Sequence, residues 1–114
     1  KVDLSDVIFD NCRFYQCEIT ECTAYGLTIT NCILDTVLIE GTPFHYKGEK
    51  DGNVKDIYKP LDIFDSQLQR VTFSGCDLEF TRGSNNEIIH LKFDNCLTAN
   101  GAMEGLEEEG DAQI

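Results

Sequence analysis

The residues in this sequence that could do chemistry are six cysteines, two histidines and a large excess of carboxylates. Four cysteines stand at positions 12, 17, 22 and 32, so they are separated by five residues or by a multiple of five. Zinc sites are usually built from Cys-x-x-Cys pairs, and the sequence contains none. This spacing disfavours a metal centre and indicates instead a structural repeat of five residues.

Neither histidine is placed to support catalysis. His45 falls in a polar segment outside the repeat, and His90 stands at the edge of a weak repeat unit, with no Ser or Cys nucleophile set beside it. The sequence also lacks a Gly-rich phosphate loop and the H-E-x-x-H, G-x-S-x-G and calcium-loop motifs. Carboxylates are so numerous that a chance pair is no argument for acid–base chemistry. We therefore expect no enzyme, no cofactor, no metal and no small-molecule substrate.

The charge balance narrows the class of partner. There are 21 acidic and 9 basic residues, a net charge of −12 and a sequence pI of about 4.3. Binding to a nucleic-acid backbone needs clustered Lys and Arg, so direct binding is not expected. No stretch approaches the roughly 20 apolar residues of a membrane-spanning helix. We expect a protein partner or self-association.

Apolar residues follow a period of five along most of the chain. From Val2 to Phe44 they fill nearly all positions of nine consecutive pentads, at the first and third residue of each. A second run from Leu61 to Thr98 follows the same rule but is shifted by one residue. The intervening segment, 45–60, is rich in Lys, Gly and Asp, so we expect a surface loop whose insertion changes the phase.

A period of five fits neither a helix nor a straight strand. On a helix, residues five apart drift by about 140° and share no face. On a strand, an odd step sends successive residues to opposite faces. The pattern can face one core only if the chain turns a corner within each pentad, so that about four pentads close one coil of a solenoid. Polar or small pairs such as Asp10-Asn11 and Glu40-Gly41 are suited to those corners.

The chain resembles the pentapeptide-repeat family. The motif Phe-Asp-Asn-Cys occurs at 9–12 and 93–96, and its variant Phe-Ser-Gly-Cys occurs at 73–76. The resemblance rests on these motifs and covers residues 2–44 and 61–98. The resemblance implies an all-β fold, a right-handed parallel β-helix with four sides and about five coils. In that family the first inward residue of each pentad is small, usually Ala or Cys, whereas Val and Leu also occupy this position here. A small β-sandwich whose strands happen to have this spacing remains the alternative.

Stacked coils place residues 20 apart above one another. Cys12 should then lie under Cys32, Cys76 under Cys96, and Phe73 under Phe93. The stacked thiols are buried small side chains, a disulfide pair or, least favoured, metal ligands. Free thiols would favour a reducing intracellular compartment or a virion over secretion. We expect one domain over 1–103, and an acidic flexible tail over 104–114.

Six apolar or aromatic residues are expected to point outward and are our candidates for partner contact. They are Ile8, Tyr15, Tyr25, Ile33, Leu38 and Leu97. Ile33 and Leu38 should occupy neighbouring sides of one coil, near Tyr15 and Tyr25. The favoured function is a non-enzymatic structural or interaction module, such as a decoration (cement-like) component of a virion.

The alternative comes from the resemblance. One branch of the family comprises gyrase-protecting proteins, acidic rods that mimic DNA and bind a type II topoisomerase. The stretch Cys12–Cys17 (Cys-Arg-Phe-Tyr-Gln-Cys) is similar to repeats of that branch. Members are longer and dimerise through a C-terminal element, whereas the end of this sequence is polar.

Overall fold

The structure is a computed structural model, and it describes residues 2–44, 49–50, 53–54, 60–79 and 81–97. Among these residues there are ten strands and no helix. In particular, the described residues form no helix that is long and apolar enough to cross a bilayer. The predicted tail and the end of the predicted domain, 98–114, lie outside the described residues.

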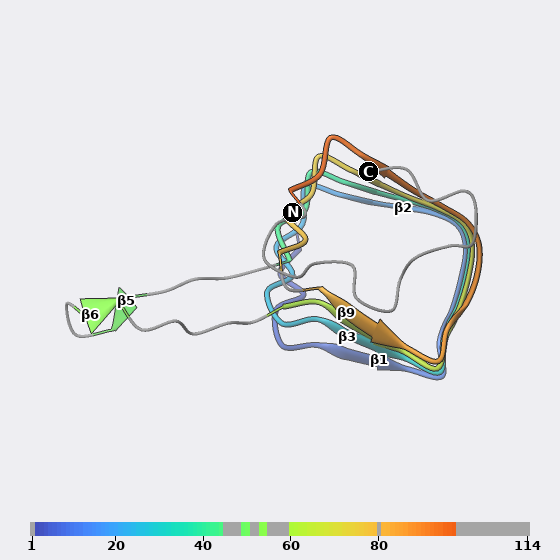
Figure 1. Ribbon diagram of the computed structural model, residues 1–114, viewed down its shortest axis with the longest axis horizontal. Helices are drawn as coiled ribbons and strands as arrows, with labels where there is room; N and C mark the ends of the chain where they lie inside the picture. The colour runs from blue at the N-terminus through green and yellow to red at the C-terminus, as the bar shows by residue number, and fades with distance from the viewer. Residues whose placement is uncertain (1, 45–48, 51–52, 55–59, 80, 98–114) are drawn as a thin grey trace.

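The strands form the walls of a right-handed parallel β-helix (Figure 1). Wall A consists of β1 (Ile8–Asp10), β3 (Thr28–Thr30), β7 (Asp62–Phe64) and β9 (Arg82–Ser84). Four longer strands each cover two walls: β2 (Arg13–Thr20), β4 (Ile33–Glu40), β8 (Gln67–Ser74) and β10 (Glu87–Asp94). Their first halves form wall B and their second halves wall C. Seen along the axis, the chain winds counterclockwise as it approaches the viewer, which is the right-handed sense usual for parallel strands.

Wall D closes the coil through single bridges instead of strands. Asp3 pairs with Thr23, and a second series joins Pro43, Asp77 and Leu97. The Ala24 amide donates to the Pro43 carbonyl at 3.2 Å and connects the two series. Walls A, B and C therefore have four levels, and wall D has five. The expected number of about five coils corresponds to four coils plus one further level on this wall.

The strand register confirms the 20-residue coil. Ile8 pairs with Thr28, Phe14 with Leu34, and Phe73 with Phe93. Between the second and third coils the step is 34 residues, since Ile33 pairs with Gln67. The 14 extra residues are not a multiple of five, which explains why the second run of pentads is shifted in phase.

The predicted surface loop at 45–60 contains regular structure. Its described residues form an antiparallel pair, β5 (Glu49–Lys50) and β6 (Asn53–Val54). This pair is drawn beyond wall D in Figure 1 and packs on none of the other described strands. The prediction of an insertion was confirmed, but the short hairpin within it was missed because two-residue strands leave no recognisable pattern.

The corners explain how a period of five becomes a closed coil. At described corners the last residue of the pentad has positive φ, as at Asn11 (60°), Gln16 (50°) and Gly41 (63°). This left-handed conformation turns the chain, and Asn, Asp and Gly adopt it at the lowest cost. Every predicted corner pair has its second residue in this conformation.

The inward residues of all four walls form one core. The buried apolar residues are Ala24, Leu27, Ile29, Cys32, Leu34, Val37, Ile39, Phe44, Leu61, Ile63, Leu68, Val71, Phe73, Cys76, Leu78, Leu91 and Phe93. The core thus accommodates Val and Leu as the first inward residue of a pentad. Val2 was expected to point inward but is 58% exposed, because wall D has no described residue beneath it.

Candidate functional site

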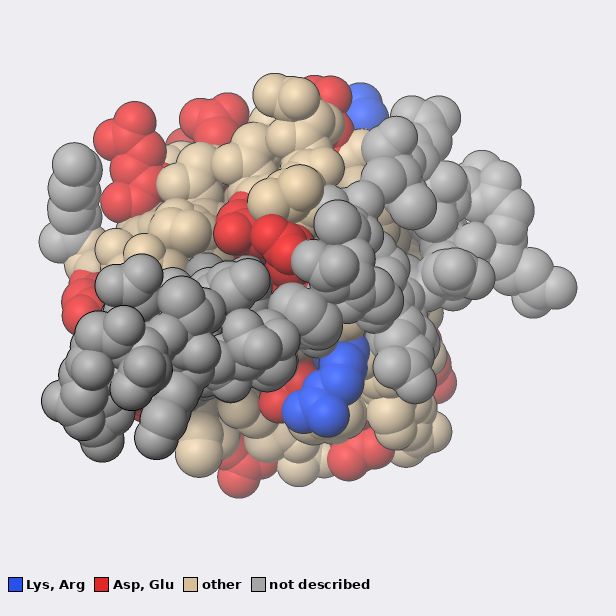
Figure 2. Space-filling model, turned by 60° about the vertical axis from the view of Figure 1, so that its left-hand side comes forward, with Lys and Arg blue, Asp and Glu red and all other residues tan. Residues whose placement is uncertain are grey.

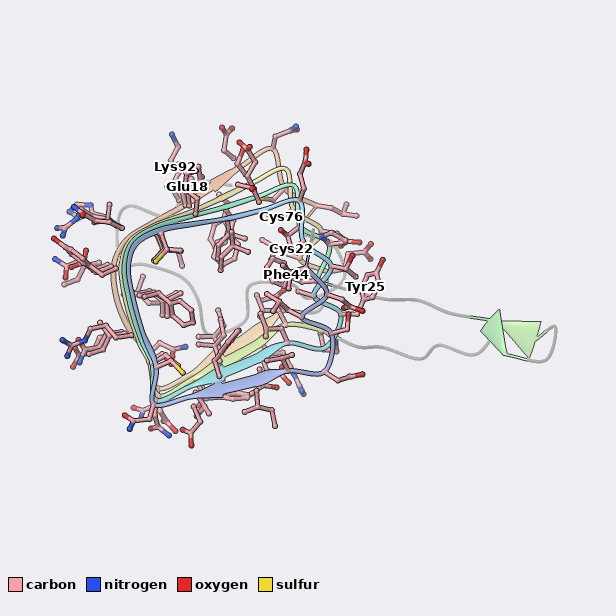
Figure 3. All side chains as sticks on the ribbon, turned by 180° about the vertical axis from the view of Figure 1, so that it is seen from behind. Glu18, Cys22, Tyr25, Phe44, Cys76 and Lys92 are labelled. Carbon is pink, nitrogen blue, oxygen red and sulfur yellow. The ribbon has the colours of Figure 1, made fainter. Side chains whose placement is uncertain are left out.

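Two of the thiols, Cys32 and Cys76, are buried in the core, and those of Cys12 and Cys96 pack against it. All six cysteines are free, so the disulfide alternative is not realised. Figure 3 shows Cys22, Cys76 and Phe44 on the inner side of wall D, with Tyr25 pointing outward. The described residues hold no group of three His, Cys, Asp or Glu side chains that could bind a metal ion.

Burial suppresses ionisation of two thiols. Desolvation raises the pKa of Cys76 from 9.0 to about 11. Its thiol also donates to the Ile39 carbonyl at 3.4 Å, a bond that only the protonated thiol can make. Burial likewise raises the pKa of Cys32, with the neighbouring Cys12 thiol acting in the same direction. A nucleophilic cysteine needs a lowered pKa, so neither thiol has the character of a catalytic group.

The six predicted contact residues do not form one patch. Ile8 lies on wall A, Leu38 on wall C, and Tyr25 and Leu97 on wall D. Only Tyr15 and Ile33 lie together, on wall B. Ile33 and Leu38 do occupy neighbouring walls of one coil, as expected, but Tyr25 faces away on the other side of the rod. The spacing of five assigns residues to walls, and the sequence-based patch had combined different walls.

Wall B contains a hollow lined by apolar and charged side chains. Tyr15 and Ile33 line a shallow hollow of about 410 Å³ together with Arg13 and Asp35. These four residues come from the adjacent strands β2 and β4, in which Arg13 pairs with Ile33 and Tyr15 with Asp35. The hollow therefore offers an aromatic and an aliphatic surface between a basic and an acidic side chain.

A polar network fixes one edge of this hollow. The Arg70 guanidinium contacts the Asp35 carboxylate at 2.7 Å and donates to the Thr36 hydroxyl at 3.1 Å. The Arg70 side chain is half-exposed, so the contribution of the pair to stability is small, but it holds Asp35 in one orientation. Farther along the wall, Ile89 is 51% exposed, and Tyr15 is 58% exposed. The sequence analysis did not single out Ile89, although its outward position in a pentad could have identified it.

Charge separates wall B from the rest of the surface. Its described residues include two acids and two bases, whereas wall C has four acids and one base. Wall D has four acids and no base among its described residues. Figure 2 turns wall D toward the viewer and shows acidic side chains spread over a surface with few basic ones. Wall A has three acids and one base, so among the described residues wall B is the one wall where an apolar surface coincides with balanced charge.

Comparisons with known proteins identify no family. No protein-family model and no curated protein matches this chain. Among solved structures, one similar chain is full-length QnrB1, a plasmid-mediated fluoroquinolone resistance protein, at 16% identity and a TM-score of 0.45. The match covers 83% of this chain and 47% of QnrB1, so this chain spans about half the length of that protein. The fold rests on the strand pairing of this chain and not on that likeness.

Proposed function

We propose that this pentapeptide-repeat-like protein is a non-enzymatic interaction module that binds a protein partner through wall B. The observation that supports this is the hollow between Arg13, Tyr15, Ile33 and Asp35. Aromatic and Arg residues around a small apolar pocket are typical of the positions that dominate binding energy in protein interfaces. The partner would insert an apolar side chain between Tyr15 and Ile33 and form hydrogen bonds at the rim.

The proposed cellular role is a structural subunit of a larger assembly, such as a decoration component of a virion. A rigid rod with a flat sheet face is suited to attachment, because it loses little conformational entropy on binding. The acidic walls would face solvent, where like charges keep neighbouring copies apart.

The test measures whether the protein sediments with the assembly from which it is isolated. Ile33→Asp replaces the aliphatic surface of the hollow with a charged carboxylate, and we expect it to reduce co-sedimentation at least tenfold. Ile8→Asp is the matched control, since Ile8 is 66% exposed on wall A and its replacement should leave co-sedimentation unchanged. Thermal unfolding of both variants checks that the fold is kept. Equal effects of the two substitutions, or no effect of Ile33→Asp, would contradict the role of wall B.

The acidic surface supports a second candidate function, mimicry of DNA for a type II topoisomerase. Walls C and D together have eight acids and one base among their described residues. The described residues form only four coils, however, and so present a short acidic face. We expect no protection of gyrase from a fluoroquinolone in a supercoiling assay. Protection that disappears when Asp77 and Glu79 are changed to Asn and Gln would favour this second function over the first.

A further inference from the structure

The outward side chains of wall B form two columns along the axis of the rod. From the first coil to the fourth, the first column consists of Arg13, Ile33, Gln67 and Glu87, and the second consists of Tyr15, Asp35, Gln69 and Ile89. The strand register aligns these residues, and Figure 3 shows the side chains of successive coils projecting at the same places around the coil. Wall B is a lateral face of the rod, so its order is set by strand pairing between the coils.

Two unpaired charges lie on strands at opposite sides of this face. Arg13 and Glu87 are exposed, and neither side chain forms an ion pair with another residue that the structure describes. The other charged residues of the wall, Asp35 and Arg70, pair with each other at 2.7 Å. Because β4 and β8 lie between β2 and β10, Arg13 and Glu87 are about 14 Å apart and do not meet within one molecule.

The apolar side chains have the same distribution as the charges. Tyr15, which is 58% exposed on the first coil, lines the hollow together with Ile33 of the second coil. Ile89, which is 51% exposed, projects outward from the fourth coil in the same column as Tyr15. The wall thus has a hollow beside its unpaired base and a projecting aliphatic side chain beside its unpaired acid.

A two-fold axis brings these features together. If the axis runs parallel to the strands, midway between β4 and β8, it reverses the order of the coils and keeps each column facing itself. The facing pairs are then Arg13 with Glu87, Tyr15 with Ile89, Ile33 with Gln67, and Asp35 with Gln69 of the other copy. Each pair occurs twice, as in any interface across a two-fold axis.

The polar pair at the centre of this arrangement also has a free acceptor. The Arg70 guanidinium and the Thr36 hydroxyl both donate to Oδ1 of Asp35, at 2.7 Å and 2.9 Å. The side-chain amide of Gln69 from the second copy can therefore donate to Oδ2, since a carboxylate accepts at both oxygens. The central Asp35 keeps its own ion pair and gains a hydrogen bond.

Other symmetric arrangements of two rods are less complementary. A two-fold axis along the rod would place Arg13 against Tyr15 and Glu87 against Ile89, so that both charges stay without an ionic partner and an apolar side chain covers the carboxylate. Walls A, C and D each have more acids than bases among their described residues. Any of these walls would bring like charges together on meeting its own copy.

We propose that wall B is the interface of a homodimer of two antiparallel rods, in which Ile89 of each copy enters the hollow beside Tyr15 of the other and Arg13 pairs with Glu87. This inference rests on the proposed function, because it names the partner of wall B. Figure 1 shows wall D and the β5–β6 pair on the opposite side of the rod, where they do not obstruct the approach. The face is small for a protein interface, so the dimer is weak.

The first test is sedimentation equilibrium of the wild type from micromolar to near-millimolar concentration. Physiological salt is used because each copy has a net charge of −12, and salt screens the repulsion between the exposed acidic walls. We expect a reversible equilibrium between monomer and dimer. Arg13→Glu or Glu87→Arg places like charges opposite each other twice in the interface, and each substitution should weaken the dimer at least tenfold.

Matched controls separate the interface from net charge. Lys92→Glu and Glu40→Arg make the same changes in charge on wall C, and both variants should dimerise within about threefold of the wild type. Thermal unfolding checks that every variant is folded.

Mixing the two charge-reversal variants is the sharpest arm of the test. In a heterodimer of Arg13→Glu with Glu87→Arg, an acidic side chain faces a basic one at both positions, so association should return to within about threefold of the wild type. The double variant Arg13→Glu/Glu87→Arg should dimerise with itself but not with the wild type. A merely structural effect of either substitution would not be reversed by mixing.

Three results would overturn the antiparallel dimer: a monomer at every concentration, equal association of the interface variants and their wall C controls, or a mixture that associates no better than its components. A monomeric wild type whose co-sedimentation with the assembly still depends on Ile33 would overturn this inference alone, because the partner of wall B would then be a different protein. Dimerisation with rescue by mixing, together with co-sedimentation that Ile33→Asp leaves unchanged, would support the dimer and contradict attachment to the assembly through wall B.

Discussion

Single residues at the corners determine whether the coil can close. At the third turn from wall C to wall D, Gly75 has φ = 63°, and the stacked positions Gly41, Glu21 and Asn95 share this conformation. A Cβ built on Gly75 would meet only the Gly41 amide nitrogen, at 4.0 Å. The position therefore has room for a side chain, and only the left-handed backbone conformation limits which residue can occupy it.

We predict that Gly75→Ala destabilises the protein by about 1 kcal/mol, because alanine adopts the left-handed conformation at a cost. Gly75→Asn should cost clearly less, since asparagine adopts this conformation more readily. Urea unfolding monitored by circular dichroism measures both. Equal losses for the two variants would indicate that the side chain clashes and that the corner geometry is wrong.

The thiol of Cys76 makes stability depend on alkaline pH. Its pKa is raised from 9.0 to about 11 in the folded state, so the folded protein holds a proton that the unfolded chain has begun to lose. Its stabilising contribution is complete below about pH 9 and is lost as the pH rises from 9 to 11.

We therefore predict that the free energy of unfolding of the wild type falls between pH 8 and pH 10. The decline should be smaller in Cys76→Val, which removes the titrating group and fills the site with a slightly larger apolar side chain. Urea unfolding at the two pH values measures the difference. An identical pH dependence in both proteins would contradict the burial of this thiol.

At this scale the sequence predicted corners well and contacts poorly. Asn11, Glu21 and Gly41 could be assigned to corners because the period of five marks every fifth residue. The left-handed conformation of Thr36, a β-branched residue with φ = 58°, follows from position and not from residue type. The hollow beside Ile33 depends on the side-chain orientations of Arg13, Tyr15 and Asp35, which the repeat does not determine.

At the scale of strands, the core is a set of ladders that run along the axis. Phe73 stacks on Phe93 with ring centroids 5.5 Å apart, and it meets Phe44 edge to face at 6.0 Å. Strand β8 thus pairs with β4 and β10 through its backbone, and its Phe73 packs on Phe93 of β10 and on Phe44 of wall D. A solenoid derives its stability from such contacts between neighbouring coils.

We predict that Phe73→Ala destabilises the protein by about 3–5 kcal/mol, the usual cost of deleting a buried aromatic ring. Phe14→Ala should cost less, because Phe14 belongs to the half-covered first coil and packs edge to face on Phe9 alone among described rings. Chemical denaturation of both variants measures the difference. A larger loss for Phe14→Ala would mean that the first coil is as well covered as the third.

One strand departs from the apolar pattern and shows where sequence reasoning weakens. In the fourth coil the inward positions of wall A are Thr81 and Gly83, followed by Asn86 on wall B. The Asn86 side chain replaces apolar packing with two hydrogen bonds, to the Ser66 amide and the Ile63 carbonyl, both at 2.9 Å. Strand β9 was therefore difficult to predict, since its register depends on backbone pairing with β7 and on this amide.

For the whole molecule, the interruption between coils two and three is the decisive feature. Every inference about walls and ends assumes that the chain resumes the same helix after the insertion, in a register 34 residues later. An uninterrupted repeat would place Leu34 against Val54 and Val37 against Ile57. The phase shift of the apolar pattern predicted a resumption after residue 60, but the sequence did not identify which coil position would be resumed.

The most direct test is to measure through-space contacts between methyl groups by nuclear magnetic resonance in solution. The structure predicts strong nuclear Overhauser effects between Leu34 and Leu68 and between Val37 and Val71, which are paired in adjacent strands. Contacts of Leu34 with Val54, or of Val37 with Ile57, in place of these would contradict the continuous four-walled helix on which the proposed wall B interface depends.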